Sequence, residues 1–122
     1  MYLVGAAHPN KERTVSILER LARDETTLVT DAEVLQEILH RYAAIDRMDA
    51  VQPAFDAILG IVDEVFPVSA DDLIRAKSLF LSTKGLSARD AVHAAIMISH
   101  EVGTLFSFDT GFDALSFLKR MS

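Results

Sequence analysis

Short apolar runs alternate with longer stretches of helical periodicity along this chain, and no other feature constrains its fold as strongly. The runs that predict β-strands are residues 26–30, 64–69 and 104–108. Elsewhere apolar side chains recur every three or four residues, as they do along one face of a helix. The helices predicted on this basis span residues 8–23, 31–45, 48–63, 69–82, 87–101 and 109–120. Short apolar strands that alternate with helices indicate a parallel sheet covered by helices on both faces, an α/β fold in three layers.

The composition narrows the class of protein further. The 122 residues suit one domain spanning 1–122, and the apolar fraction of 50% is enough for a buried core. The sequence contains no cysteine, which excludes disulfides, thiolate zinc sites and a cysteine nucleophile. No apolar run approaches the roughly 20 residues that cross a membrane, and nothing resembles a signal peptide. We therefore expect a cytoplasmic protein.

The charge balance is acidic, with a formal net charge of −6. This counts against a protein that holds nucleic acid through a broad basic face. It leaves open an enzyme that gathers carboxylates around divalent cations, because bound metal reverses the local field.

Three acids are candidates for such a site, and each also has an ordinary structural interpretation. Glu37 lies beside the apolar stripe of a predicted helix, where it could simply face solvent. Asp90 follows Ser87 by three residues, which is the capping-box spacing, so it is either a helix cap or a metal-binding carboxylate. Asp109 comes directly after the strand predicted at 104–108. It could cap the last helix, or it could bind a ligand, since ligands bind beyond the carboxyl ends of parallel strands.

A histidine lies one helical turn after the second of these acids. His93 could face the same pocket as Asp90, but we predict a packed, hydrogen-bonded histidine. The other histidines show no spacing typical of a zinc site; they are His8, His40 and His100.

Four segments of the sequence, taken together, resemble the PIN-domain nucleases, and most closely the VapC-type toxins of bacterial toxin–antitoxin pairs. These segments are HPNKERT, TDAEVLQEIL, LSARDAVHAA and LFSFDTGFD. They occur in the family's order and at about its spacing, and the resemblance covers nearly the whole chain. It implies a single PIN-like domain.

The resemblance also implies an activity, a cofactor and partners. The expected activity is that of an endoribonuclease that depends on Mg²⁺ or Mn²⁺. Glu37, Asp90 and Asp109 would be its catalytic metal ligands, with Asp113 and Ser107 in a possible outer shell. Hard divalent cations prefer carboxylate oxygens and can activate water against a phosphodiester. The implied partners are RNA, a cognate antitoxin and a second copy of the chain.

The match departs from the family at the beginning of the chain. The family opens with a buried strand that ends in Asp-Thr-Asn, whereas MYLVGAAHPN resembles the end of the helix that follows that strand. We therefore expect an N-terminally truncated domain that lacks the usual first strand and one metal-binding acid. The true start could lie upstream, another segment or chain could fill the position, or the chain could be a decayed homologue. The alternative function is a catalytically impaired module that retains only partner binding.

An acidic pocket flanked by apolar helices suits a partner with an amphipathic helix, or an extended segment, that ends in Arg or Lys. Leu3, Val4 and Ile17 are the predicted lining of the groove for it. Alternatively, these side chains complete the core.

Overall fold

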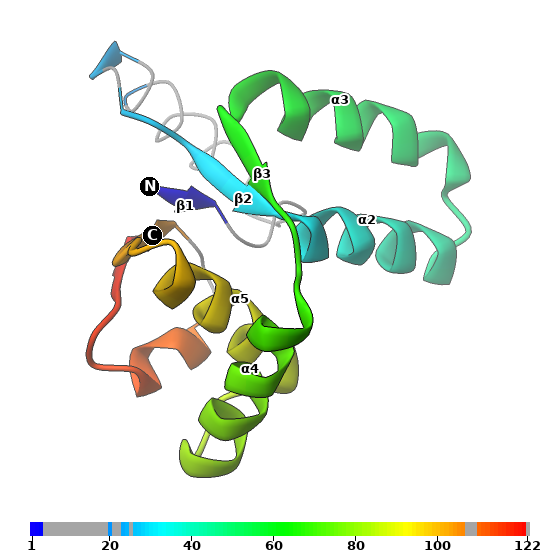
Figure 1. Cartoon of the computed structure of the whole chain (residues 1–122). Coiled ribbons are helices and arrows are strands. Elements are labelled where there is room, and N and C mark those ends of the chain that lie inside the picture. The colour runs from blue at the N-terminus through cyan, green and yellow to red at the C-terminus, as the bar shows by residue number, and fades with distance from the viewer. Residues whose placement is uncertain (4–19, 21–22, 25, 107–109, 122) are drawn as a thin grey trace.

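Five short strands, all parallel to their neighbours, form a sheet in the order β3-β2-β1-β4-β5 (Figure 1). The computed structural model describes residues 1–3, 20, 23–24, 26–106 and 110–121. The strands are β1 (Tyr2–Leu3), β2 (Val29–Asp31), β3 (Glu64–Phe66), β4 (Thr104–Phe106) and β5 (Lys119–Met121). The strands predicted at 26–30, 64–69 and 104–108 correspond to β2, β3 and β4, so the parallel sheet expected from the sequence is confirmed.

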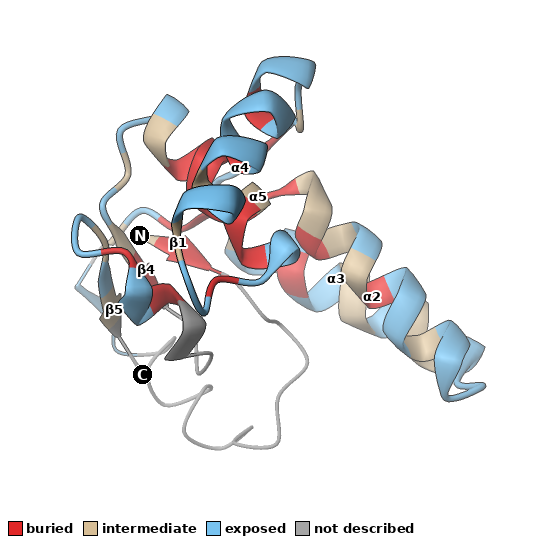
Figure 2. Ribbon diagram, turned by 90° about the horizontal axis from the view of Figure 1, so that it is seen from below, coloured by how far each residue is buried: buried red, intermediate tan, exposed pale blue. Residues whose placement is uncertain are grey.

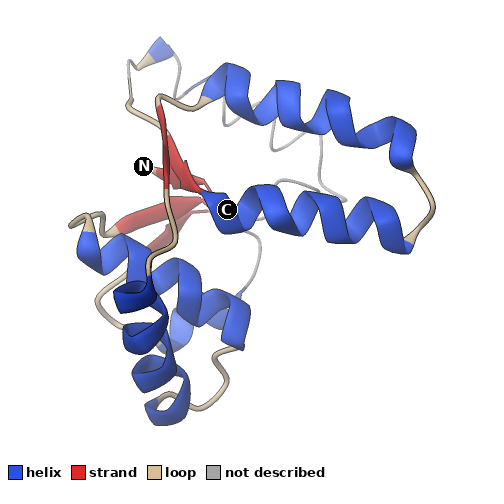
Figure 3. Cartoon of the chain, turned by 45° about the vertical axis from the view of Figure 1, so that its right-hand side comes forward, coloured by secondary structure: helices blue, strands red, loops and turns tan. Residues whose placement is uncertain are grey.

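The helices form two pairs on opposite sides of this sheet (Figure 3). They are α2 (Ala32–Ala44), α3 (Val51–Ile61), α4 (Ala70–Ser82) and α5 (Ala88–Ser99), with short 3-10 helices η1 (Met48–Ala50) and η2 (Thr110–Ala114). α2 and α3 run antiparallel as one pair, and α4 packs on α5 as the other. The helix predicted at 8–23 lies almost entirely outside the described residues. Within the described part, no helix combines the length and apolar character needed to cross a membrane.

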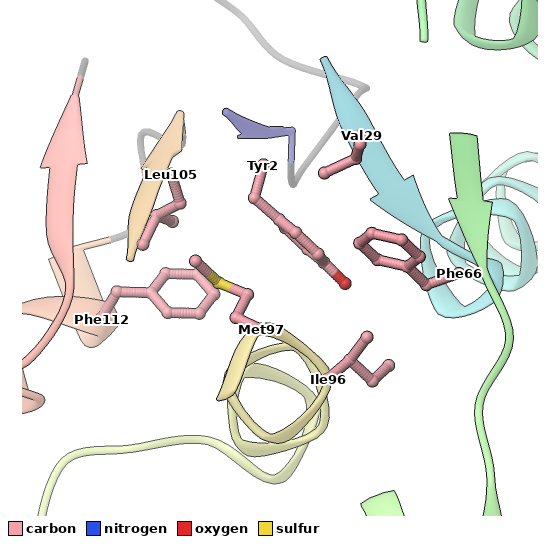
Figure 4. Packing of buried hydrophobic residues seen from close by; sticks show 7 residues of the cluster. All are labelled: Tyr2, Val29, Phe66, Ile96, Met97, Leu105 and Phe112. Carbon is pink, nitrogen blue, oxygen red and sulfur yellow. The ribbon is translucent and has the colours of Figure 1, made fainter. Parts of the chain in front are cut away.

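The two residues of β1 connect both helical layers to the sheet. Consecutive side chains of a strand point to opposite faces, so Tyr2 and Leu3 serve different cores. Tyr2 points toward α5 and belongs to a cluster shown in Figure 4, whose other members are Val29, Phe66, Ile96, Met97, Leu105 and Phe112. Leu3 packs with Ile38 of α2 and Ile58 of α3. The three-layer α/β/α arrangement predicted from the sequence is therefore confirmed.

The place in the sheet that the missing first strand was expected to leave open is occupied by β1. Tyr2–Leu3 occupies the central position, where Tyr2 aligns with Val29 on one side and Leu105 on the other. Another segment of the chain thus fills the place. However, neither residue of β1 carries an acid. Leu3 is only 3% exposed, so it completes the core and does not line a partner groove, while Val4 and Ile17 lie outside the described residues.

Two predicted helix boundaries also need correction. The helix predicted at 87–101 corresponds to α5, which ends at Ser99, and Glu101 adopts the left-handed conformation with φ of 56°. The last predicted helix, 109–120, is instead η2 followed by β5. Without β5, strand β4 would present an unpaired edge of backbone groups, and three residues of β5 pair with it. Sheet pairing therefore outweighs the local helical pattern there.

Candidate active site

Asp31 ends β2 and begins α2, at the edge of the sheet where parallel strands present their carboxyl ends. Its Oδ1 accepts a hydrogen bond from the backbone N–H of Val34 at 3.0 Å, which caps the helix. Its Oδ2 accepts from the hydroxyl of Tyr2 and from Nδ1 of His93 at 2.6 Å. The side chain is fully buried, and a buried carboxylate is tolerated only when hydrogen bonds of this kind satisfy it.

His93 of α5 bridges two carboxylates. Its Nδ1 lies 2.6 Å from Oδ2 of Asp31, and its Nε2 lies 2.8 Å from Oε1 of Glu37. Because ionised carboxylates only accept hydrogen bonds, both ring nitrogens donate and the imidazole is protonated. Burial alone would lower the pKa of His93, but the hydrogen bonds to Asp31 and Glu37 outweigh it and raise the pKa to about 10. The prediction of a packed, hydrogen-bonded histidine is confirmed.

Glu37 of α2 lies directly against the first turns of α5. Its Oε1 contacts Nε2 of His93 and, at 3.5 Å, Nε of Arg89. The His93 ring is completely buried, whereas the Arg89 side chain is 67% exposed, so the two contacts differ in strength. Among the hydrogen bonds of the described residues, none uses the second oxygen, Oε2, and the Glu37 side chain remains 18% exposed. Glu37 thus has one oxygen fixed by His93 and a side chain that is not fully buried.

Asp90 occupies the first turn of α5, between the two residues that contact Glu37. Its backbone N–H donates to the hydroxyl of Ser87 at 3.1 Å, so Ser87 caps the helix. The residue is buried, at 4% exposure. Arg89 and His93 flank it in sequence, and both touch Glu37. The structure therefore brings the helical turn that carries Asp90 to the Glu37 carboxylate.

The remaining predicted site residues fall into two groups. Asp109 and Ser107 lie outside the described residues. Asp113 is exposed on η2 and forms a two-pronged pair with Arg120 of β5, at 2.9 and 3.2 Å. The Arg120 hydrogen bonds lower the pKa of Asp113. Asp113 is thus engaged by the neighbouring strand.

Sequence reasoning missed two acids near this site. Asp31 is the first, although it follows the apolar run LVT directly and so satisfies the same rule that singled out Asp109. Glu33 is the second: partial burial, followed by the negative charge of Glu37 one turn away, raises the pKa of Glu33. The helical spacing of Glu33 and Glu37 could have indicated this local concentration of negative charge.

The donor chemistry suits a hard cation, but the described residues do not complete a metal site. Glu37 and Asp90 offer carboxylate oxygens, which Mg²⁺ and Mn²⁺ prefer. Within the part of the chain that the structure describes, no group of three or more His, Cys, Asp or Glu side chains is arranged to hold a metal ion. The oxygens of Asp31 already accept three hydrogen bonds. A further ligand, such as Asp109, is therefore needed.

Comparison with known proteins gives consistent matches over the whole chain. The sequence pattern of the PIN domain matches residues 1–118. Ribonuclease VapC13 of Mycobacterium tuberculosis is 52% identical over 122 residues, which are 100% of this chain and 93% of that protein. Ribonuclease VapC23 of the same organism is 33% identical over 109 residues, covering 89% of this chain and 86% of that protein.

Solved structures share the fold. VapBC2 from Rickettsia felis, bound to a DNA fragment from its promoter, matches with a TM-score of 0.74 at 22% identity, covering 98% of this chain and 96% of that chain. VapC20 of Mycobacterium tuberculosis, a toxin that cleaves the sarcin–ricin loop, matches with a TM-score of 0.74 at 21% identity, covering 98% of each chain. At these identities the likeness supports the three-layer fold alone.

Proposed function

Because this chain belongs to the PIN-domain family, among the VapC ribonucleases, we propose that it is an endoribonuclease that depends on Mg²⁺ or Mn²⁺ and is the toxin of a toxin–antitoxin pair. The reaction is hydrolysis of a phosphodiester bond in RNA. Carboxylates of this chain would hold the divalent cation, which would supply activation of a water and stabilisation of the charge on the leaving oxygen.

Glu37, Asp90 and Asp109 hold the cation in this proposal, and one observation supports it above the others. The Glu37 carboxylate contacts Arg89 and His93, so it lies against the turn of α5 that carries Asp90. Strand β4 runs parallel to β1 and β2, so its end at Phe106 lies at the same sheet edge as Asp31. Asp109 follows three residues later in the sequence. Ser107 stays in the proposed outer shell; Asp113, paired with Arg120, does not.

The proposed antitoxin offers a cationic side chain to this site. Arg89 already places its Nε 3.5 Å from Oε1 of Glu37, so a guanidinium group fits beside this carboxylate. An Arg or Lys from the antitoxin would neutralise the same carboxylates and compete with the metal.

We further propose that the chain forms a homodimer through the outer face of α4. Four large apolar side chains are exposed there in two pairs seven residues apart: Leu73, Ile74, Phe80 and Leu81. Figure 2 shows this outer face exposed while α5 beneath it is largely buried. A two-fold interface joins the same patch on both copies, so the patch must be complementary to itself. An apolar stripe meets this requirement, because apolar side chains can pack against their own copies. The molecular mass in solution tests this: a strict monomer contradicts it.

Cleavage of RNA by the purified chain, with and without divalent cations, tests the main proposal. We expect cleavage with Mg²⁺ or Mn²⁺, none with excess chelator, and a large loss with Glu37→Gln, which keeps the side-chain shape and removes the charge. Cleavage that persists in chelator, or in the Glu37 variant, contradicts the proposed metal site.

One observation favours the alternative function, a PIN-like module that retains only partner binding. β1, at the centre of the sheet, consists of Tyr2 and Leu3, so it contributes no carboxylate to the edge of the sheet where the candidate site lies. Calorimetric titration with Mn²⁺ separates the two functions. A chain that binds its antitoxin or itself, yet neither binds Mn²⁺ nor cleaves RNA, is such a module.

A further inference from the structure

A continuous hydrogen-bonded bridge links the central strands to the exposed edge of the candidate site. It runs from Tyr2 of β1 through Asp31 of β2 and His93 of α5 to Glu37 of α2. We propose that His93 is a positioning residue, which holds the Glu37 carboxylate in the orientation that binds the metal. This inference rests on the proposed function, because it takes Glu37 as a metal ligand.

The inner end of the bridge is fixed. Asp31 ends one of the central strands and caps α2, and its two oxygens accept from Val34, Tyr2 and His93. Both Asp31 and His93 are fully buried. A side chain held at this many points in a packed interior has one orientation, so the His93 ring is oriented through its Nδ1.

The outer end of the bridge acts on Glu37. A glutamate side chain has three rotatable bonds, and a free carboxylate on a helix samples several positions. The 2.8 Å bond from Nε2 of His93 fixes Oε1 of Glu37, and this leaves Oε2 directed by the geometry of the carboxylate. Arg89 cannot do the same, because its contact is longer, at 3.5 Å, and its side chain is mostly exposed. A metal ligand held in this way loses less freedom when the cation binds.

Two substitutions at position 93 separate the two ends of the bridge. The side-chain amide of asparagine lies near the place of Nδ1, so His93→Asn can keep the bond to Asp31 but not the one to Glu37. The longer glutamine reaches the place of Nε2, so His93→Gln can keep the bond to Glu37 but not the one to Asp31. Both variants are neutral, which means that the lost imidazolium charge affects them equally.

Mn²⁺ affinity of the full chain, measured by calorimetry, is the first readout. Losing a hydrogen-bond partner of a metal ligand lowers metal affinity about 10–100-fold. We expect His93→Asn to bind Mn²⁺ at least about tenfold more weakly than His93→Gln. Arg89→Gln serves as the matched control, and we expect less than about a threefold change, since exposed ion pairs contribute little. Equal Mn²⁺ affinities of the two folded His93 variants would overturn the proposal.

If the chain binds no Mn²⁺, the proposed function is contradicted, and the positioning role of His93 needs a test without metal. That test is a double-mutant cycle between His93→Asn and Glu37→Gln, measured as equilibrium constants of unfolding in urea. Directly bonded side chains are energetically coupled, so we expect the two effects to deviate from independence by at least about threefold. Independent effects would show that His93 does not hold Glu37. If a His93 variant is unfolded, the milder pair Glu37→Gln and Asp31→Asn is measured in the same way, and independence there overturns the bridge.

Discussion

Two helices of this protein begin with almost the same four residues, but the aspartate at the fourth position has different surroundings in each. α4 begins at Ser-Ala-Asp-Asp (69–72) and α5 begins at Ser-Ala-Arg-Asp (87–90). In both, the serine hydroxyl accepts a hydrogen bond at 3.1 Å from the backbone N–H three residues later. The bond from the backbone N–H to the serine hydroxyl is therefore the same in the two helices.

The two acids of these motifs differ in their tertiary neighbours. Asp72 completes the capping box, because its Oδ2 accepts from the backbone N–H of Ser69 at 3.0 Å. Its Oδ1 accepts from the hydroxyl of Ser99, near the end of α5, at 2.9 Å. One oxygen of Asp72 thus caps α4, and the other joins α4 to α5. Asp90 instead lies in the turn that faces Glu37. One motif therefore serves as a structural clamp or as part of a candidate site, depending on what packs against it.

The largest expected difference between the motifs is in catalysis. Asp90→Asn keeps the side-chain shape but removes the charge that binds metal in our proposal. A metal ion contributes several kcal/mol to such catalysis, so we expect the cleavage rate to fall at least about 100-fold. Asp72→Asn should leave cleavage within about threefold, because both oxygens of Asp72 bind protein groups away from the site. Initial rates of RNA cleavage in Mg²⁺ compare the two variants.

The control for this comparison is the far-ultraviolet circular dichroism of both variants, which must match that of the parent chain. Equal rates for Asp90→Asn and the parent would return Asp90 to the role of a simple cap.

Substitution of Asp72 should affect stability more than it affects RNA cleavage. The amide of Asp72→Asn retains only one accepting oxygen, so one of the hydrogen bonds from Ser69 and Ser99 is lost. Hydrogen bonds to charged groups contribute about 1.5–3 kcal/mol, so we expect the free energy of unfolding to fall by about 2 kcal/mol. Urea denaturation followed by circular dichroism measures the change; an unchanged midpoint would show that the clamp is dispensable.

Lowering the pH should remove the contribution that the Asp72 carboxylate makes to the free energy of unfolding. Burial raises the pKa of Asp72, but the hydrogen bonds from Ser69 and Ser99 outweigh it, so the pKa lies below the ordinary value. A carboxyl whose pKa is lowered by folding stabilises the protein above the unfolded value of about 3.9 and loses that effect as pH falls further. The stability gap between the parent and Asp72→Asn should therefore narrow from pH 5 toward pH 2. A gap that stays constant over this range would contradict the assignment.

The smallest effect is expected from exchanging the residues by which the motifs differ. Asp71→Arg turns the first motif into the second, and Arg89→Asp turns the second into the first. Both side chains are exposed, and a charge at a helix N-terminus contributes about 0.3–1 kcal/mol. We expect changes in unfolding free energy below about 1 kcal/mol, in opposite directions, measured by urea denaturation. Larger changes would show that the third position, and not the neighbours of the acid, distinguishes the motifs.

The sequence predicted those parts of the fold that local interactions determine. Apolar periodicity predicted the helices at 31–45, 69–82 and 87–101, which correspond to α2, α4 and α5. The spacing of Ser87 and Asp90 also indicated the start of α5. β1 and β5 could not be predicted in this way. Two or three residues have no recognisable period, and their strand conformation depends on hydrogen bonds to β2 and β4.

The candidate site was predictable only in part for a similar reason. Glu37 and Asp90 emerged from motifs that each occupy one segment. The role of Asp31 depends on His93, which lies 62 residues away and reaches it only after the sheet and α5 have packed. The spacing of residues within one segment cannot predict such a contact.

Because the central strand β1 pairs with a strand from late in the chain, the candidate site can form only late in synthesis. β1 leaves the ribosome before the other described strands, yet one of its two partners is β4, which is more than 100 residues later in the sequence. The pair β2–β3 and the helices α2 and α3 are complete in sequence long before that. Domains generally fold as units, and here the unit closes only after α5 and β4 have been synthesised. Glu37 meets His93 at that late stage, so an unfinished chain carries no assembled site.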